Sequence, residues 1–136
     1  TPRYNGKAYY PSWRQLFGPY GAGQNVRVLR YAEILLIAAE AKIHQGDVSG
    51  AATYLNKVRQ RVNLPVISNP TLDDILKERR LELAMEGDRF FDLVRTGKAA
   101  EVLGPLGFKK KKNEVFPIPS QQIELSQGKL TQNQGY

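Results

Sequence analysis

The chain has no cysteine and only one histidine, one methionine and one tryptophan among its 136 residues. The absence of cysteine excludes a disulfide framework and a thiolate metal site, although it does not fix the compartment. Long apolar runs are missing too, since the longest covers residues 34–39 and is far too short for a membrane helix. The chain opens on Thr1 with neither a methionine nor a signal segment, so we expect it to be a piece of a longer protein.

The apolar content is sufficient for one domain over residues 1–136, because 41% of the residues are hydrophobic. Proline and glycine gather towards the two ends and leave the middle regular. We therefore predict a mainly α protein in three segments. An aromatic, loop-rich segment occupies residues 1–25, a helical core residues 26–98, and an extended tail residues 99–136.

The net charge is +7, and Lys109–Lys112 form a run of four lysines. Both features raise the question of nucleic-acid binding. Most other basic residues lie close to acidic ones, as in residues 77–95, which favours internal pairing over a phosphate-facing stripe. The lysine run lies between Gly107-Phe108 and Asn113, so we interpret it as a solvated loop and expect no nucleic-acid partner.

Residues 28–45 are rich in Ala, Leu, Ile and Glu, and Gly46 follows where a left-handed helix cap belongs. Asp47 is then a suitable N-cap, and apolar residues recur at helical spacing as far as Val62. The pattern predicts a helical hairpin of tetratricopeptide-like size, about 34 residues. Units of this kind bury little alone and usually need about three neighbours, so we expect further units before Thr1.

A long third helix is predicted to begin after Thr71, an N-cap followed by acidic residues in the first turn. Its main apolar stripe consists of Leu72, Ile75, Leu76, Leu83, Phe90, Leu93 and Val94. Four charged residues on or near this helix are expected to pair with one another or with neighbours in an architectural role: Arg79, Glu82, Glu86 and Arg89. Because Leu81 and Met85 lie on the opposite side, we expect this helix to be covered on more than one face.

The residues from Gly104 onward change character to glycine, proline and short apolar runs. The letters VFPIP at Val115–Pro119 predict an extended segment, since a residue that precedes proline is disfavoured in the helical region. We expect a few short strand-like pieces to complete this tail, and we expect the tail to help complete the core.

Glu33, Glu40 and His44 fall on one stripe of the first predicted helix, and two carboxylates with an imidazole could hold a divalent metal. Helical di-metal sites usually repeat a Glu-x-x-His spacing on a second helix, which a chain with one histidine cannot do. We prefer the interpretation that Glu33 and Glu40 pair with Arg30 or with a residue of another helix. No serine–histidine–aspartate order, phosphate loop or hydrolase carboxylate pair can be assembled, so we predict no catalysis, no metal and no cofactor.

Five motifs, in order, resemble the C-terminal half of the SusD/RagB family. They are VLRYAEILLIAAEA (28–41), LNKVRQR (55–61), ERRLELAMEGDRFFDLVRTG (78–97), FPIP (116–119) and LTQNQGY (130–136). The last resembles the family's usual QNPGY, with Gln134 in place of proline.

This resemblance implies a surface-exposed, lipid-anchored protein of the Bacteroidetes outer membrane, built on tetratricopeptide-like helices. Members of the family capture glycans and cap a TonB-dependent transporter barrel. The implied partners are therefore an oligosaccharide or polysaccharide and a SusC-like transporter. The signal peptide, the lipidated cysteine and the first helices that the family carries would all precede Thr1.

The letters AYYPSWRQLFGPYG at residues 8–21 concentrate aromatic rings in a segment broken by proline and glycine. In the context of the family, exposed rings can stack on the flat C–H faces of sugars while polar side chains meet the hydroxyls. The predicted ligand-binding residues are Trp13, Tyr9, Tyr10, Tyr20 and Arg14. The alternative is that these rings only pack this segment against the helices, which is the more common role of any single loop aromatic.

Three functional classes follow from the sequence. The leading one is a non-catalytic glycan-capture component of an uptake system. The second is a tetratricopeptide-like protein-interaction scaffold without sugar binding of its own. The third, a glycan-degrading enzyme, is the least favoured because no acid–base pair can be identified.

Overall fold

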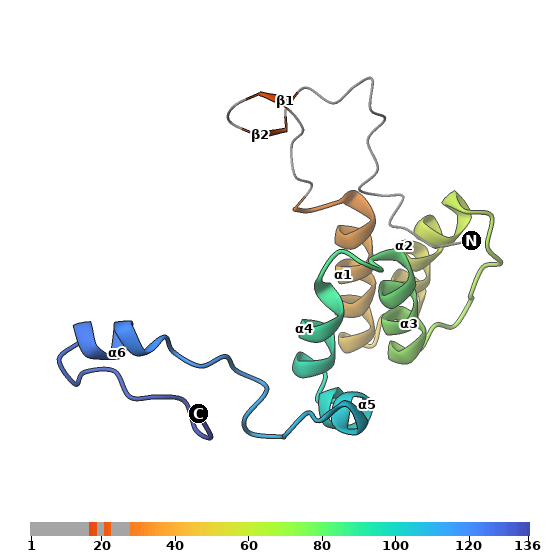
Figure 1. The fold of residues 1–136 in the computed structure, drawn as a ribbon. Helices are drawn as coiled ribbons and strands as arrows, with labels where there is room; N and C mark the ends of the chain where they lie inside the picture. Colours follow the sequence, from red (N-terminus) through yellow and green to blue (C-terminus); the bar gives the residue numbers. More distant parts are fainter. Residues whose placement is uncertain (1–16, 19–20, 23–27) are drawn as a thin grey trace. The chain divides into compact units, whose positions relative to one another are not determined.

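The computed structural model describes residues 17–18, 21–22 and 28–136 of the chain (Figure 1). These residues are divided between two compact units, one ending at Glu86 and the other running from Gly87 to Tyr136. The first unit contains two short antiparallel strands, β1 (Phe17–Gly18) and β2 (Gly21–Ala22). The organisation of residues 1–136 as a single domain stays a prediction.

A helical hairpin forms the centre of the first unit. Helix α1 (Tyr31–His44) packs against α2 (Val48–Arg61). These are the two helices of the hairpin that the sequence predicted. Gly46 has φ +77°, the left-handed conformation expected at the end of the first helix. The Asp47 carboxylate accepts a hydrogen bond of 2.8 Å from the backbone N–H of Gly50, so the predicted N-cap is confirmed as well.

The core of this unit is a cluster of buried apolar side chains from three helices. Its members are Leu35, Leu36, Ala39, Ala51, Leu55, Val58 and Ile75. The small side chains of Ala39 and Ala51 allow the backbones of α1 and α2 to approach each other. A largely buried ion pair between Arg59 and Glu78 connects α2 to α3 (Leu72–Glu82) beside this cluster.

Helix α3 begins with the predicted cap, because Thr71 and Asp74 form a reciprocal capping box. It ends at Glu82, and the predicted long third helix is in fact two helices, α3 and α4 (Asp88–Arg95). Met85 with φ +66° and Gly87 with φ +100° interrupt the helical backbone between them. The apolar spacing continues in phase across this break, so periodicity alone did not predict it.

The expectation that α3 is covered on its opposite side also differs from the structure. Leu81 and Met85, the two residues concerned, are 60% and 73% exposed in this chain. The stripe itself is placed as expected, since Ile75, Leu76 and Leu83 are buried.

The second unit begins with α4 and continues through α5 (Ala99–Leu103), η3 (Gly104–Leu106) and α6 (Ser120–Leu125). The tail was predicted to be extended with short strand-like pieces, but it contains these short helices instead. Residues 116–119 are extended, as the two prolines predict. The ring of Phe90 contacts the rings of Phe91, Phe108 and Phe116 at centroid distances of 5.6, 6.4 and 6.1 Å.

Two motifs that are separate in the sequence bind each other in this unit. The Gln132 amide accepts from the N–H of Ile118 and donates to its carbonyl, both at 2.8 Å. Asn133 donates to the carbonyl of Phe116 at 2.6 Å, and the Tyr136 hydroxyl donates to the carbonyl of Val115 at 3.0 Å. The QNQGY ending therefore satisfies the backbone polar groups of the extended VFPIP segment.

The lysine run lies in a turn that follows Phe108, where Lys109, Lys110 and Lys111 are exposed, as expected for a solvated loop. Lys112 lies over the ring of Tyr136, with its Nζ 4.6 Å from the ring centroid. The mainly α prediction is confirmed. Within the described residues, none of the helices combines the length and apolar character needed to cross a bilayer.

Candidate functional site

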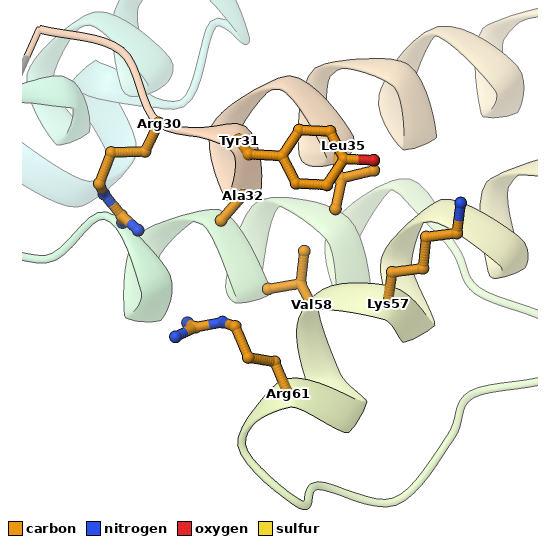
Figure 2. Close-up of a pocket in the computed structure, with 7 residues that line it drawn as sticks. All are labelled: Arg30, Tyr31, Ala32, Leu35, Lys57, Val58 and Arg61. Carbon is orange, nitrogen blue, oxygen red and sulfur yellow. The ribbon is translucent and has the colours of Figure 1, made fainter.

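The first unit contains a pocket of about 440 Å³ where the start of α1 lies beside the last turns of α2 (Figure 2). It is lined by Arg30, Tyr31, Ala32, Leu35, Lys57, Val58 and Arg61. Its volume lies within the roughly 300–1,000 Å³ that is usual for small-molecule sites.

The floor of the pocket is apolar because it is formed where the buried stripes of the two helices meet. Leu35 is 7% exposed and Val58 1% exposed, so both also belong to the core cluster. Tyr31 is 72% exposed, and Figure 2 shows its ring lying over Leu35 at the edge of this floor. The pocket thus offers an exposed aromatic wall above a fixed apolar base, an arrangement that suits a flat ligand face.

One side of the pocket is fixed by the Arg30 side chain, which precedes α1. Its Nε and Nη2 atoms donate to the two carboxylate oxygens of Glu86 at 2.7 and 2.9 Å. Its Nη1 donates to the Glu82 carboxylate at 2.9 Å, and Nη2 also donates to the Glu82 carbonyl at 3.0 Å. These bonds connect the beginning of α1 to the end of α3 and hold the guanidinium in one orientation.

The carboxylates of Glu82 and Glu86 change the pKa of Arg30. Its hydrogen bonds with Glu86, and then those with Glu82, raise the pKa of Arg30 above its ordinary value, despite the opposing effect of burial. The guanidinium is therefore a permanent charge at every accessible pH.

Two further cations line the pocket from α2. Arg61 Nη2 donates to both carboxylate oxygens of Glu82 at 2.8 Å, so Glu82 receives bonds from two guanidinium groups. Lys57 is exposed, and its Nζ lies 5.7 Å from the centroid of the Tyr54 ring. In the view of Figure 2 the Lys57 ammonium and the Arg61 guanidinium extend to opposite sides of Val58.

The structure does not describe the ligand-binding residues that were predicted from the sequence. Trp13, Tyr9, Tyr10, Tyr20 and Arg14 all lie outside the described residues.

The four charged residues assigned an architectural role are all within the described chain. Glu82 and Glu86 bind Arg30, which lies 52 and 56 positions earlier in the sequence. Arg79 is 5% exposed, and Arg89 is half-buried on α4. Burial of the Arg79 charge next to the core agrees with a structural position rather than a surface one.

The suggested metal stripe on α1 brings together only two of its residues in the structure. His44 Nε2 lies 4.0 Å from Glu40 Oε1, one helical turn away. Over the described parts of the chain, no group of three or more side chains of the metal-binding types is assembled.

Sequence reasoning did not predict the pocket residues Tyr31, Lys57 and Arg61 as site residues. A signal for the Arg30 contacts was present, because Arg30 lies in the VLRYAEILLIAAEA motif and its two carboxylate partners lie in the ERRLELAMEGDRFFDLVRTG motif. An arginine and two glutamates in such motifs are candidates for pairing, but their separation in sequence gives no geometry.

The family model for the SusD family matches residues 16–107 of this chain. One SusD-like protein of Formosa agariphila is 36% identical over 125 residues, which covers 82% of this chain and 25% of that protein. A second SusD-like protein of Formosa agariphila is 34% identical over 95% of this chain and 30% of its own length.

Solved structures are also similar to this chain in sequence and in fold. A laminarin-binding SusD-like protein is 51% identical, with a TM-score of 0.72 over 80% of this chain and 23% of its own. Surface glycan-binding protein A from Bacteroides uniformis is 34% identical, with a TM-score of 0.68 over 83% of this chain and 28% of its own. The chain spans about a quarter of the length of the relatives that it matches.

Proposed function

The chain belongs to the SusD family, and we propose that it is part of a non-catalytic glycan-binding component of an outer-membrane polysaccharide uptake system. The component captures oligosaccharides and delivers them to a SusC-like TonB-dependent transporter. In this proposal the protein is surface-exposed and held at the outer membrane by a lipid anchor.

One observation carries the proposal: the fold and sequence likeness to a solved laminarin-binding SusD-like protein, at 51% identity and a TM-score of 0.72. The likeness to a solved surface glycan-binding protein, at 34% identity, points in the same direction. We extend glycan binding to the present chain because its likeness to this relative includes the sequence as well as the fold.

The residues proposed to contact the glycan are Trp13, Tyr9, Tyr10, Tyr20 and Arg14. Sugar rings have weakly polar C–H faces that stack on aromatic rings, while hydroxyls accept from cationic side chains. The concentration of rings in residues 8–21 is the sequence feature that supports this assignment. Binding by stacking requires no acid–base pair, which agrees with a capture function rather than hydrolysis.

The proposal is tested by affinity electrophoresis and titration calorimetry against a panel of neutral polysaccharides that includes laminarin. We compare the wild type with a Trp13→Ala, Tyr20→Ala double variant, and use Phe91→Ala as the matched control. Phe91 is 61% exposed and lies outside the proposed platform. Loss of two stacking contacts is expected to weaken binding by about five- to 150-fold, because each contributes about 0.5–1.5 kcal/mol.

Two results would count against the proposal. Absence of binding by the wild type to every polysaccharide, together with binding of a partner protein, would favour the tetratricopeptide-like scaffold. Release of reducing sugars by the pure protein would contradict the non-catalytic assignment.

A further inference from the structure

The rim of the pocket in the first unit is rich in hydrogen-bond donors and poor in acceptors. Among the described residues, Arg30, Lys57 and Arg61 line it, and no carboxylate or carboxamide does. The phenol of Tyr31 is the one neutral polar side chain among these described lining residues. A ligand in this pocket therefore meets mainly N–H donors.

The donors of Arg30 are already engaged. Nε, Nη1 and Nη2 all bind oxygens of Glu82 or Glu86, so this guanidinium shapes the wall and has little capacity left for a ligand. Its role at the pocket is to hold the wall in place.

Arg61 and Lys57 differ from Arg30 in this respect. Only Nη2 of Arg61 is bound to Glu82, and within the described chain its Nε and Nη1 have no acceptor. The Arg61 side chain is 55% exposed, so these donors are open to solvent. Lys57 contacts a ring face, and among the described residues no carboxylate pairs with it.

The charges of the residues at the pocket indicate which chemical group of a ligand would bind there. Among the described residues, Arg30 and Arg61 pair with the carboxylates of Glu82 and Glu86, and no carboxylate pairs with Lys57, so the positive charge of Lys57 is in excess. A neutral sugar hydroxyl both donates and accepts, and its donor would find few acceptors here. A carboxylate only accepts, and it would neutralise the excess charge.

We propose that this pocket is a binding subsite for a hexuronic acid residue of the captured glycan. The sugar ring stacks on Tyr31 above the floor of Leu35 and Val58. Its carboxylate is bound by Lys57, and ring hydroxyl oxygens accept from Nε and Nη1 of Arg61. The inference rests on the proposed glycan-binding function and deepens it, because it specifies the charge class of the glycan.

The test uses a matched pair of ligands, a galacturonic acid trisaccharide and its fully methyl-esterified form. The two differ in the charge of the carboxyl group and share the sugar ring. By titration calorimetry the wild type is expected to bind the acid at least about tenfold more tightly than the ester. Raised salt is expected to reduce this preference, because the pocket rim is solvent-exposed.

The variant Lys57→Gln removes the excess charge, and Lys77→Gln is the matched control. Lys77 is an exposed lysine on α3 of the same unit and does not line the pocket. We expect Lys57→Gln to abolish the preference for the acid and Lys77→Gln to retain it. Tyr31→Ala is expected to weaken both ligands. If Tyr31→Ala reduces helicity by circular dichroism, Lys57→Gln alone carries the test, since Lys57 is outside the core.

Equal affinity of the wild type for the acid and the ester would overturn this inference, as would equal losses in the two lysine variants. If the acid and the ester bind equally, but laminarin binds the wild type and not the Trp13→Ala, Tyr20→Ala variant, the glycan-binding proposal stands and only the acidic subsite is wrong. If no sugar of either kind binds the wild type, both proposals are wrong.

Discussion

In residues 28–86, seven apolar side chains from three helices pack into one buried cluster, whereas residues 87–136 bury only two apolar residues, Leu93 and Ala99. Large apolar side chains in the second unit remain open, with Leu106 at 82% and Leu125 at 69% exposure. The first unit is therefore stabilised mainly by apolar area removed from water. The second depends on specific polar contacts between distant segments.

The polar contacts of the second unit connect segments that are distant in the sequence. Gln132, Asn133 and Tyr136 satisfy backbone groups of residues 115–118, a segment that has no helix or sheet partner of its own. A side chain that bonds both the N–H and the carbonyl of one residue must have a defined length and an amide group. The residue type at such positions is therefore fixed by hydrogen-bond geometry. A residue in an apolar core, in contrast, can be exchanged for another hydrophobic residue of similar volume.

The largest effect is expected from truncation in the core of the first unit. Leu55 is fully buried on α2, and Leu55→Ala should lower the free energy of unfolding by about 2–5 kcal/mol, through lost burial and the cavity left behind. Leu125→Ala in the second unit is the matched control, with an expected change below about 0.5 kcal/mol. Urea denaturation measures both. Comparable losses in the two variants would show that the contrast in burial does not govern stability.

A smaller effect is expected from breaking the polar contacts of the second unit. Gln132→Ala leaves the N–H and the carbonyl of Ile118 without their partner, at an expected cost of about 1–2 kcal/mol. Hydrogen exchange should locate the effect, with faster exchange at Ile118 and unchanged protection in α1 and α2. The control is Gln121→Ala, an exposed glutamine of α6. Unchanged exchange at Ile118 in Gln132→Ala would contradict this role.

The smallest effect concerns the cap of α3. Hydrogen bonds from the Thr71 side chain, and then from its backbone N–H, lower the pKa of Asp74 below its ordinary value. A lowered pKa in the folded state adds stability above the unfolded-state pKa, and this stability is lost as the pH falls through the folded-state pKa. Asp74→Asn should therefore cost about 0.5–1 kcal/mol at neutral pH.

The pH dependence distinguishes this cap from a general effect of charge. The difference between wild type and Asp74→Asn should begin to shrink as the pH falls below about 4, where Asp74 of the unfolded wild type becomes protonated, and it should vanish only below the lowered pKa of the folded state. Glu124→Gln, an exposed acid on α6, removes the same charge without a cap and serves as the control. A difference between Asp74→Asn and wild type that is constant with pH would exclude the carboxylate as its origin.

Features that depend on near neighbours along the chain could be predicted from the amino-acid letters alone. The helical hairpin, its stop at Gly46, the caps at Asp47 and Thr71 and the extended 116–119 segment all rest on local conformational preferences. The family could also be predicted from the sequence, because its motifs are short strings of residues in a fixed order. The ring-rich segment lies outside the described residues, and its role in binding stays a prediction.

Features that depend on residues distant in the sequence could be established only from the packing of the helices. The break between α3 and α4 is set by left-handed backbone at Met85 and Gly87, while the apolar period continues through it. The binding of Arg30 to Glu82 and Glu86 joins residues more than 50 positions apart, and the pocket that these contacts border joins the start of α1 to the last turns of α2. Periodicity and capping act within one or two helical turns, whereas such contacts depend on how helices pack, and packing fixes which charges meet and which stay open to a ligand.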